Sequence, residues 1–201
     1  MSSGKKGSLE IICGPMFSGK SEELIRRLRR AKIAQQHVMV FKPSIDNRHM
    51  IECVTSHNGS KLDAFPVDDL KVILDQGSKD SAQVIGLDEV QFFDAGIVPI
   101  ICSLIDMGKR VVAAGLDLDF RGAPFGSMPL LLAIADHVTK LQAICTLCGK
   151  DANFTQRLVD GKVARHDDPI ILVGAQEAYQ ARCRQCYSID KQPSFYYMSA
   201  L

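Results

Sequence analysis

Short apolar runs alternate with longer segments of helical periodicity along the first two-thirds of the chain. The apolar runs predict buried strands at residues 9–13, 37–41, 82–87, 110–115 and 137–141. The segments between them predict helices at residues 21–36, 66–76, 95–107 and 127–135. Near-continuous apolar strands, each followed by a helix, are typical of a parallel sheet covered on both faces. The pattern therefore predicts an α/β fold with a parallel sheet flanked by helices.

Prolines and polar residues suggest where some of these elements begin and end. We expect the second strand to stop before Pro43 and the second helix to start at Pro66, because proline is favoured in a first helical turn. Ser127 is a candidate cap for the last helix. The polar segment 44–62 is predicted to be a long, mobile loop with a short strand at residues 51–55.

The pattern changes after residue 142. From there to residue 190 the chain has short β-like runs and paired cysteines, and it shows no long helical period. We therefore predict three parts: an α/β nucleotide-binding domain at residues 1–142, a small second domain at 143–190, and a loosely held tail at 191–201.

The composition narrows the classes of protein. Of the 201 residues 23% are charged and 46% hydrophobic, and the net charge is +1, so no basic field favours a nucleic-acid partner. The longest apolar stretch, residues 129–135, is too short to span a bilayer, and the first residues lack the apolar core of a signal peptide. We expect a cytoplasmic protein that binds neither nucleic acid nor membrane.

Residues 14–21 read GPMFSGKS and match the phosphate-binding loop pattern in full. The members of this loop are Gly14, Pro15, Met16, Phe17, Ser18, Gly19, Lys20 and Ser21. Its backbone N–H groups can face phosphate oxygens, Lys20 can reach the β- and γ-phosphates, and Ser21 can hold Mg²⁺. An apolar strand before the loop and a helix after it favour a nucleotide site over a glycine turn that matches by chance. The motif therefore predicts that the parallel sheet belongs to a P-loop, RecA-like fold.

Asp88 and Glu89 follow a predicted apolar strand, at the edge where α/β sheets bind ligands. An aspartate here typically holds the Mg²⁺ that bridges nucleotide phosphates, and the neighbouring glutamate can accept a proton from an attacking oxygen. Water as that oxygen would make a hydrolase, and a substrate hydroxyl would make a kinase. The pair alone does not distinguish a hydrolase from a kinase. Two acids at this position can also be solvated side chains at the end of a strand, with no function.

Four of the seven cysteines form two C-x-x-C pairs. Cys145, Cys148, Cys183 and Cys186 supply the four thiolates of a closed, structural Zn²⁺ site, whereas ordinary buried cysteines or a redox pair are the alternatives. Such a site would clamp the ends of the apolar run at residues 169–175, whose backbone could then bond a ligand. The remaining cysteines, Cys13, Cys53 and Cys102, are predicted to be buried.

Taken together, the motifs resemble the type II thymidine kinases, and the chain looks like a bacterial member. The resemblance covers roughly residues 8–190. It includes GPMFSGKS, Asp46-Asn47-Arg48, residues 88–93 (DEVQFF), residues 116–126 (LDLDFRGAPFG) and the cysteine pairs. It implies transfer of the γ-phosphoryl group of ATP to the 5′-hydroxyl of thymidine, feedback by thymidine triphosphate, and a homotetramer. Val90 departs from the alanine or glycine that is common in the family.

The resemblance also implies residue roles. Glu89 is the general base, and Asp88 and Ser21 hold Mg²⁺. Asp46 acts through water at the metal ion and Arg48 on phosphate charge, and Gln91 joins the nucleotide-binding set. A loop between the cysteine pairs lies over the base as a lasso. The residues that would enclose the nucleoside are Met16, Phe92, Leu116, Phe120, Phe125, Thr155, Ile170, Ile171, Leu172, Val173, Gly174 and Tyr179.

Two other functions fit parts of the pattern. One is a P-loop ATPase whose zinc domain binds single-stranded nucleic acid or a protein. The net charge and the aromatic-poor run between the cysteine pairs speak against the nucleic acid. The other is a regulatory nucleotide-binding protein without chemistry, against which Glu89 weighs. Arg121 is either a further cation toward phosphate or a salt-bridged loop residue.

Overall fold

A six-stranded parallel sheet forms the centre of the molecule in a computed structural model of the chain, which describes residues 6–44, 53–55, 61–79, 81–170 and 177–190. The strand order is β5-β2-β6-β7-β1-β8, and every neighbouring pair is parallel. The strands are β1 (Ser8–Cys13), β2 (Val38–Pro43), β5 (Phe65–Val67), β6 (Val84–Leu87), β7 (Arg110–Gly115) and β8 (His137–Lys140). The predicted α/β class is confirmed.

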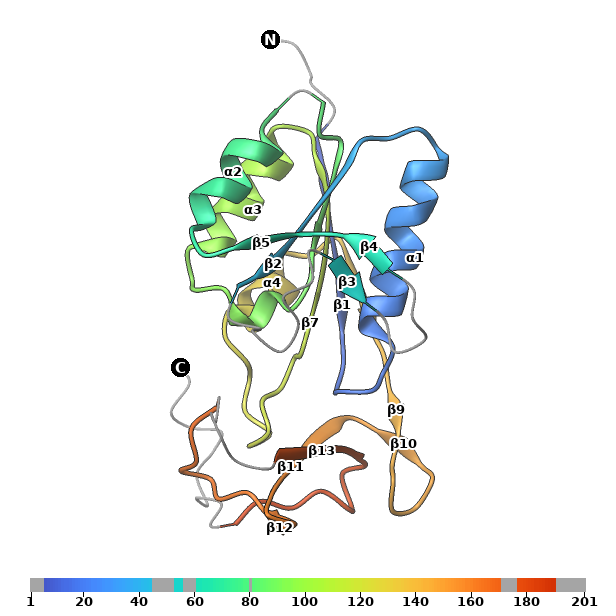
Figure 1. The fold of residues 1–201 in the computed structure, drawn as a ribbon, viewed down its shortest axis with the longest axis vertical. Helices are drawn as coiled ribbons and strands as arrows, with labels where there is room; N and C mark the ends of the chain where they lie inside the picture. The colour runs from blue at the N-terminus through green and yellow to red at the C-terminus, as the bar shows by residue number, and fades with distance from the viewer. Residues whose placement is uncertain (1–5, 45–52, 56–60, 80, 171–176, 191–201) are drawn as a thin grey trace.

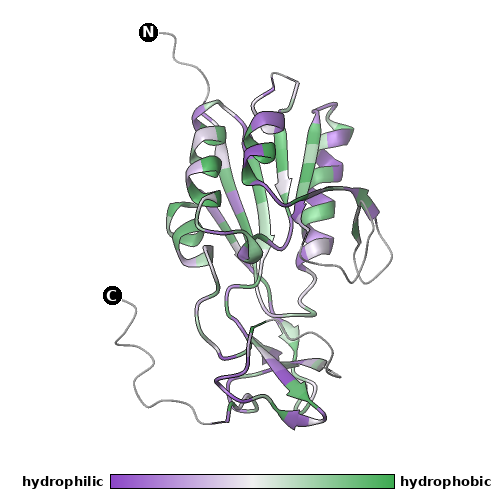
Figure 2. Ribbon diagram, turned by 60° about the vertical axis from the view of Figure 1, so that its left-hand side comes forward, coloured by the Kyte–Doolittle hydropathy of each residue, from purple (hydrophilic) through white to green (hydrophobic). Residues whose placement is uncertain are grey.

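Helices cover both faces of this sheet (Figure 1). They are α1 (Lys20–Ile33), α2 (Leu70–Gly77), α3 (Ile97–Asp106) and α4 (Met128–Ile134). One buried cluster joins α1 to one face of the sheet, and a second joins α2, α3 and α4 to the other. Hydrophobic residues accordingly dominate the strands, while the helices carry hydrophilic residues as well (Figure 2). These two cores hold the carboxyl ends of the strands in place.

Two predictions based on proline were wrong. The helix expected from Pro66 begins at Leu70 instead, where the Asp69 side chain accepts a hydrogen bond from the Lys71 N–H across 2.9 Å. Pro66 itself lies in β5, an edge strand, where a missing N–H need not break a ladder. Pro43 likewise belongs to β2 as its last residue.

The segment that was predicted to be a loop contains two short strands. These are β3 (Cys53–Thr55), which agrees with the strand expected at residues 51–55, and β4 (Lys61–Asp63), which was not expected. They pair antiparallel beside α1 (Figure 1). Ser127 precedes α4 but makes no side-chain cap, since its hydroxyl hydrogen bonds to the Asp94 carbonyl. The prediction that Ser127 caps α4 was therefore wrong.

The cysteine-bearing part of the chain lies beyond the carboxyl ends of the sheet strands (Figure 1). Its strands are β9 (Ala143–Ile144), β10 (Asp151–Ala152), β11 (Phe154–Val159), β12 (Lys162–Val163) and β13 (Glu177–Arg182). They form a two-stranded sheet, β10-β9, and a three-stranded sheet, β12-β11-β13. The domain boundary at residue 142 stays a prediction, and the predicted tail lies outside the described residues. Among the described residues, no helix has the length and apolarity needed to cross a membrane.

Candidate active site

The phosphate-binding loop connects the end of β1 to the start of α1. Gly14 has φ 142°, and a side chain there would meet the Leu141 carbonyl oxygen at 2.3 Å. Gly19, directly before α1, has φ 83°, which favours glycine over residues with a side chain. The loop therefore turns tightly and presents Lys20 and Ser21 in the first turn of the helix, where backbone N–H groups favour anions.

Arg27 fixes the helix behind this loop. Its guanidinium bonds Glu10 on β1 at 2.8 Å, Glu23 one turn earlier at 2.7 Å, and the Thr139 hydroxyl on β8 at 2.7 Å. Glu10 also accepts from Arg110 on β7 at 2.6 Å. One partly buried network thus ties α1 to three adjacent strands. It holds the first turn of α1 in register with the sheet.

The Lys20 ammonium group is buried and bends back over its own loop, donating to the Pro15 carbonyl oxygen across 2.8 Å. Burial lowers the pKa of Lys20, and the charges of Glu89 and Asp88 partly offset that effect. Lys20 is therefore a desolvated cation with two carboxylates nearby. A phosphate group is the kind of ligand that such a cation can bind strongly.

Asp88, which follows β6, lies against Ser21. The Ser21 hydroxyl donates to the Asp88 carboxylate across 3.3 Å. Burial, followed by the negative charge of Glu89, raises the pKa of Asp88 to about 7. A hydroxyl and a carboxylate are oxygen ligands of the kind Mg²⁺ prefers, and a cation would compensate the buried charge. The residues therefore fit a Mg²⁺ site.

Glu89 stands in a constrained position beside this pair. Its backbone is left-handed, with φ 49°, and a short 3₁₀ helix, η1 (Val90–Phe92), follows it. The Gln91 side-chain amide donates to the Glu89 carboxylate across 2.5 Å. The same amide's oxygen accepts from the Leu116 N–H across 3.0 Å, and Gln91 is buried. Gln91 thus joins the candidate base to the end of β7.

A further carboxylate here was missed by the sequence reasoning. Asp117 is 6% exposed, and one of its oxygens forms an ion pair with Lys140 at 2.7 Å. Among the described residues, no hydrogen-bond partner meets its other oxygen. The charge of Asp117 acts on both Lys20 and Cys13, which places it close to the phosphate-binding loop. The signal was present in the sequence as an acid after an apolar strand, the feature that singled out Asp88.

The loop after β7 supplies several of the predicted nucleoside residues. Phe120 and Phe125 are buried, and Phe125 meets Phe92 edge to face with ring centroids 5.4 Å apart. Asp119 shapes this loop, because its side chain accepts the N–H groups of Arg121 and Ala123. Arg121 also pairs with Asp119 at 2.8 Å, so of its two predicted roles the salt bridge is observed.

The cysteine-bearing part contacts the phosphate-binding loop directly. The Met16 N–H donates to the Thr155 hydroxyl across 3.0 Å, and Thr155 is buried on β11. Tyr179 lies on β13, opposite Arg157 of β11, and Ile170 is 37% exposed. The remaining predicted residues lie outside the described ones: Asp46, Arg48, Ile171, Leu172, Val173 and Gly174. Their placement in the site stays a prediction.

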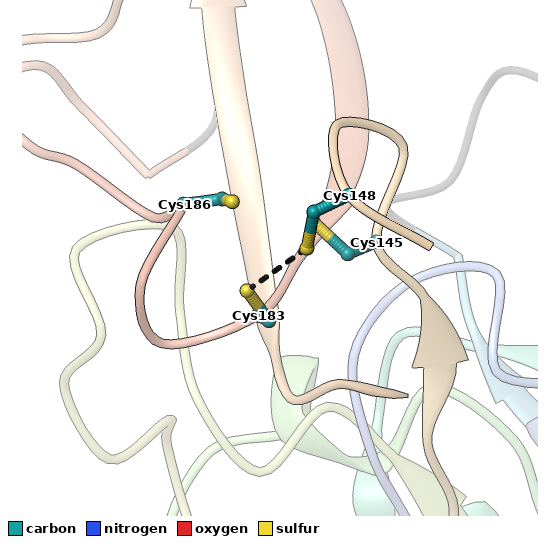
Figure 3. Close-up of side chains that lie close together, drawn as sticks. All are labelled: Cys145, Cys148, Cys183 and Cys186. Carbon is teal, nitrogen blue, oxygen red and sulfur yellow. Dashed lines mark hydrogen bonds between the residues drawn. The ribbon is translucent and has the colours of Figure 1, made fainter. Parts of the chain in front are cut away.

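The four predicted zinc ligands lie close together just after the carboxyl ends of β9 and β13. Their sulfur atoms point into one space from two turns (Figure 3), and all lie within 4.8 Å of one another. The Cys148 and Cys183 sulfurs are 3.6 Å apart. Sulfur ligands at about 2.3 Å from a tetrahedral zinc ion lie about 3.8 Å from each other. The geometry therefore fits Zn²⁺.

The thiols of this cluster also differ in how strongly they hold protons. Burial raises the pKa of Cys145, but backbone hydrogen bonds outweigh it and lower the pKa to about 6. Hydrogen bonding to Cys183 raises the pKa of Cys186 to about 12. Four close sulfurs cannot all ionise without a cation, which is the chemistry of a metal-binding donor set. Of the other cysteines, Cys13 is buried as predicted, whereas Cys102 is exposed on α3, so that prediction was wrong.

Comparison with known proteins agrees with the motifs. A family model described as "Thymidine kinase" matches residues 7–187. The match includes the phosphate-binding loop, the acids after β6, the loop after β7 and the four clustered cysteines.

Proposed function

Because the chain belongs to the thymidine kinase family, we propose that it transfers the γ-phosphoryl group of ATP to the 5′-hydroxyl of thymidine. The observation that carries the proposal is the arrangement around Glu89, a hydrogen-bonded carboxylate beside Asp88 and the Lys20 ammonium group. A phosphate-binding loop alone serves hydrolases and kinases equally. A held carboxylate at the same sheet edge adds the base that an acceptor hydroxyl requires.

The donor nucleotide belongs on the loop at residues 14–21. Its backbone N–H groups and Lys20 would bind the phosphates, with Lys20 exchanging the Pro15 carbonyl for a phosphate oxygen. Ser21 and Asp88 would hold Mg²⁺, which when bound neutralises charge on the phosphates. The family resemblance adds Asp46 and Arg48 to this side of the site.

Glu89 acts on the acceptor in this proposal. Its carboxylate would accept the proton of the 5′-hydroxyl as the oxygen attacks the γ-phosphorus, while the bond from that phosphorus to the β,γ-bridging oxygen breaks and ADP leaves. Gln91 keeps that carboxylate oriented by its hydrogen bond of 2.5 Å. Gln91 is therefore better assigned to orienting the base than to the nucleotide itself. In-line positioning and charge neutralisation supply the rest, since phosphoryl transfer needs little covalent chemistry from the protein.

The nucleoside would lie between the sheet edge and the cysteine-bearing part. Met16 and Thr155 meet at this junction, and Phe120 and Phe125 provide buried apolar surface on the sheet side. Structural Zn²⁺ on the four cysteines would keep β11 and β13 in place. Exclusion of water from the acceptor site would favour transfer to the nucleoside over hydrolysis of ATP.

Other properties follow from the family resemblance alone. These are a homotetramer, inhibition by thymidine triphosphate and a cytoplasmic location.

One assay tests the proposal directly. Purified protein is incubated with ATP, Mg²⁺ and thymidine, and thymidine monophosphate is separated and quantified. A matched reaction without thymidine measures hydrolysis of ATP. If thymidine monophosphate and ADP form at equal rates, the result supports the kinase. ADP release that is independent of thymidine would instead indicate the ATPase alternative.

A further inference from the structure

Phe120 is held from two sides by the cysteine-bearing part of the chain. It is 5% exposed and lies in the loop after β7, among the residues proposed to enclose the nucleoside. The Tyr187 hydroxyl donates to its carbonyl oxygen across 2.7 Å. The Arg157 guanidinium lies over its ring, 4.8 Å from the centroid. Arg121, the next residue in the chain, also lies over this ring at 5.7 Å, so the shorter ring contact and the hydrogen bond to the backbone both come from residues far along the chain.

Arg157 is an unusual residue for this position, because its side chain is fully buried. Burying a guanidinium costs solvation free energy, which only specific contacts can offset. Besides the Phe120 ring, those contacts include the Pro169 carbonyl oxygen at 2.5 Å. Arg157 lies two residues from Thr155 on β11, so both side chains lie on the same side of the strand. That side faces the phosphate-binding loop through Met16.

Tyr187 connects Phe120 to the cysteine cluster. It follows Cys186 directly, and its backbone N–H donates to the Cys183 carbonyl across 2.9 Å. Its ring stacks on Phe154 of β11, with centroids 4.6 Å apart and an angle of 20° between the rings. The position of the Tyr187 hydroxyl is therefore set by two contacts: the backbone hydrogen bond to Cys183 and the stacking of the ring on Phe154.

We propose that Arg157 and Tyr187 are positioning residues that set the affinity for the nucleoside by holding Phe120, and that this is a route by which the cysteine cluster acts on the acceptor pocket. The inference rests on the proposed function, since it assigns a role within the acceptor side of that site. The contacts of Arg157 and Tyr187 with Phe120, Pro169 and the Cys183 carbonyl all lie on the acceptor side of the site. Their effect should therefore fall on nucleoside binding and leave donor binding and the chemical step nearly unchanged.

Tyr187→Phe is the cleanest test, because it removes one hydroxyl and keeps the ring stacked on Phe154. Loss of one hydrogen bond is expected to weaken thymidine binding about fivefold. Arg157→Lys keeps the charge but loses the planar group over the ring and the geometry toward Pro169, and is expected to weaken it about tenfold or more. Arg184→Lys is the matched control, because Arg184 is exposed and lies over the Phe154 ring at 4.9 Å.

Three quantities are measured for each protein: the dissociation constant for thymidine by calorimetry, that for a non-hydrolysable ATP analogue with Mg²⁺, and the bound zinc per chain. Steady-state assays add the KM for thymidine and kcat. The expected result is a higher dissociation constant and KM for thymidine in both variants. Binding of the ATP analogue, zinc content and kcat should stay within about twofold of the wild type, and Arg184→Lys should match the wild type throughout.

The outcomes separate the inference from the proposed function. If the wild type binds thymidine and Tyr187→Phe binds it equally well, the inference is overturned and the proposed function stands. Equal loss of thymidine and ATP-analogue binding would also overturn it, since that is the result of a general structural role. If the wild type neither binds nor phosphorylates thymidine, both are overturned. Should Arg157→Lys lose zinc, Tyr187→Phe alone decides.

Discussion

Gln91 donates a hydrogen bond of 2.5 Å to Glu89, and both residues follow the same strand, β6. The amide is buried and its oxygen accepts a hydrogen bond from the Leu116 N–H, so its orientation is set by the residue that follows the neighbouring strand, β7. An amide that is fixed at one end can hold a carboxylate at the other. The hydrogen bond from Gln91 explains how the flexible side chain of Glu89 can be held in one orientation in the site.

Replacing the proposed base should slow the chemical step strongly and leave the donor site intact. In Glu89→Gln the side chain keeps its size but cannot accept the proton of the 5′-hydroxyl. We expect kcat to fall by about 10² or more, with the dissociation constant for an ATP analogue unchanged. Single-turnover kinetics and calorimetry measure the two quantities. Asp75→Asn, an exposed acid on α2, is the control for loss of one charge, and an unchanged kcat in Glu89→Gln would reassign the base.

Removing the amide that orients the base should have a smaller effect of the same kind. Gln91→Leu leaves Glu89 present but without its hydrogen-bond donor, and it leaves the Leu116 N–H without its acceptor. We expect kcat to fall about tenfold, since one charge-assisted hydrogen bond is lost from the base. The double variant Glu89→Gln/Gln91→Leu should be no slower than Glu89→Gln alone. Additive effects in this cycle would show that Gln91 acts independently of Glu89.

Loss of one zinc ligand should weaken the binding of thymidine. Cys183→Ser removes a thiolate from the cluster, and Cys183 also supplies the carbonyl that the Tyr187 N–H donates to. We expect zinc content and thymidine affinity to fall together. Metal analysis and calorimetry on one preparation provide the two readouts. Cys102→Ser, an exposed cysteine on α3, is the control, and normal thymidine affinity in a zinc-free Cys183→Ser protein would contradict the expectation.

Acid should weaken the anchoring of α1 in a defined pH range. The hydrogen bond from Arg26, with further help from Arg27, lowers the pKa of Glu23 from 4.5 to about 2. A carboxylate whose pKa is lower in the folded state stabilises the fold at pH values above 4.5, and that stabilisation is lost as the pH falls toward 2. In Glu23→Gln the loss in the free energy of unfolding should therefore be full at pH 6 and smaller at pH 3.

Urea unfolding of both proteins at several pH values measures this difference. Arg26→Gln provides a second test, because it removes the largest cause of the shift: the pKa of Glu23, followed by NMR, should rise in that variant. A constant difference between Glu23→Gln and the wild type from pH 6 to pH 3 would show that the ion pairs contribute nothing to stability.

Features fixed by local sequence were predictable. A phosphate-binding loop constrains its own backbone through Gly14 and Gly19, and a buried parallel strand needs an apolar run, so β1, β6 and β7 could be located from the sequence. Two C-x-x-C pairs likewise predicted one cluster, because few other arrangements satisfy four nearby thiols.

Features that depend on tertiary neighbours were not predictable. Pro66 suggested a helix start, yet the residue joins the edge of the sheet, and only the strand order shows that its missing N–H is tolerated there. The hydrogen bonds from the Leu116 N–H to Gln91 and from the Tyr187 hydroxyl to Phe120 join segments whose proximity the sequence pattern does not reveal. Asp117 carried the same sequence signal as Asp88, an acid after an apolar strand, but its burial and its ion pair with Lys140 depend on tertiary packing.

The left-handed backbone at Glu89 has a consequence for the balance between stability and activity. A residue with a side chain is disfavoured at φ 49° by about 1 kcal/mol relative to glycine. Glu89→Gly would relieve this strain, but it would also remove the carboxylate to which the buried Gln91 amide donates, so its two effects on the free energy of unfolding oppose each other. Backbone strain at the position of a proposed catalytic base is the pattern expected where some stability is given up for turnover.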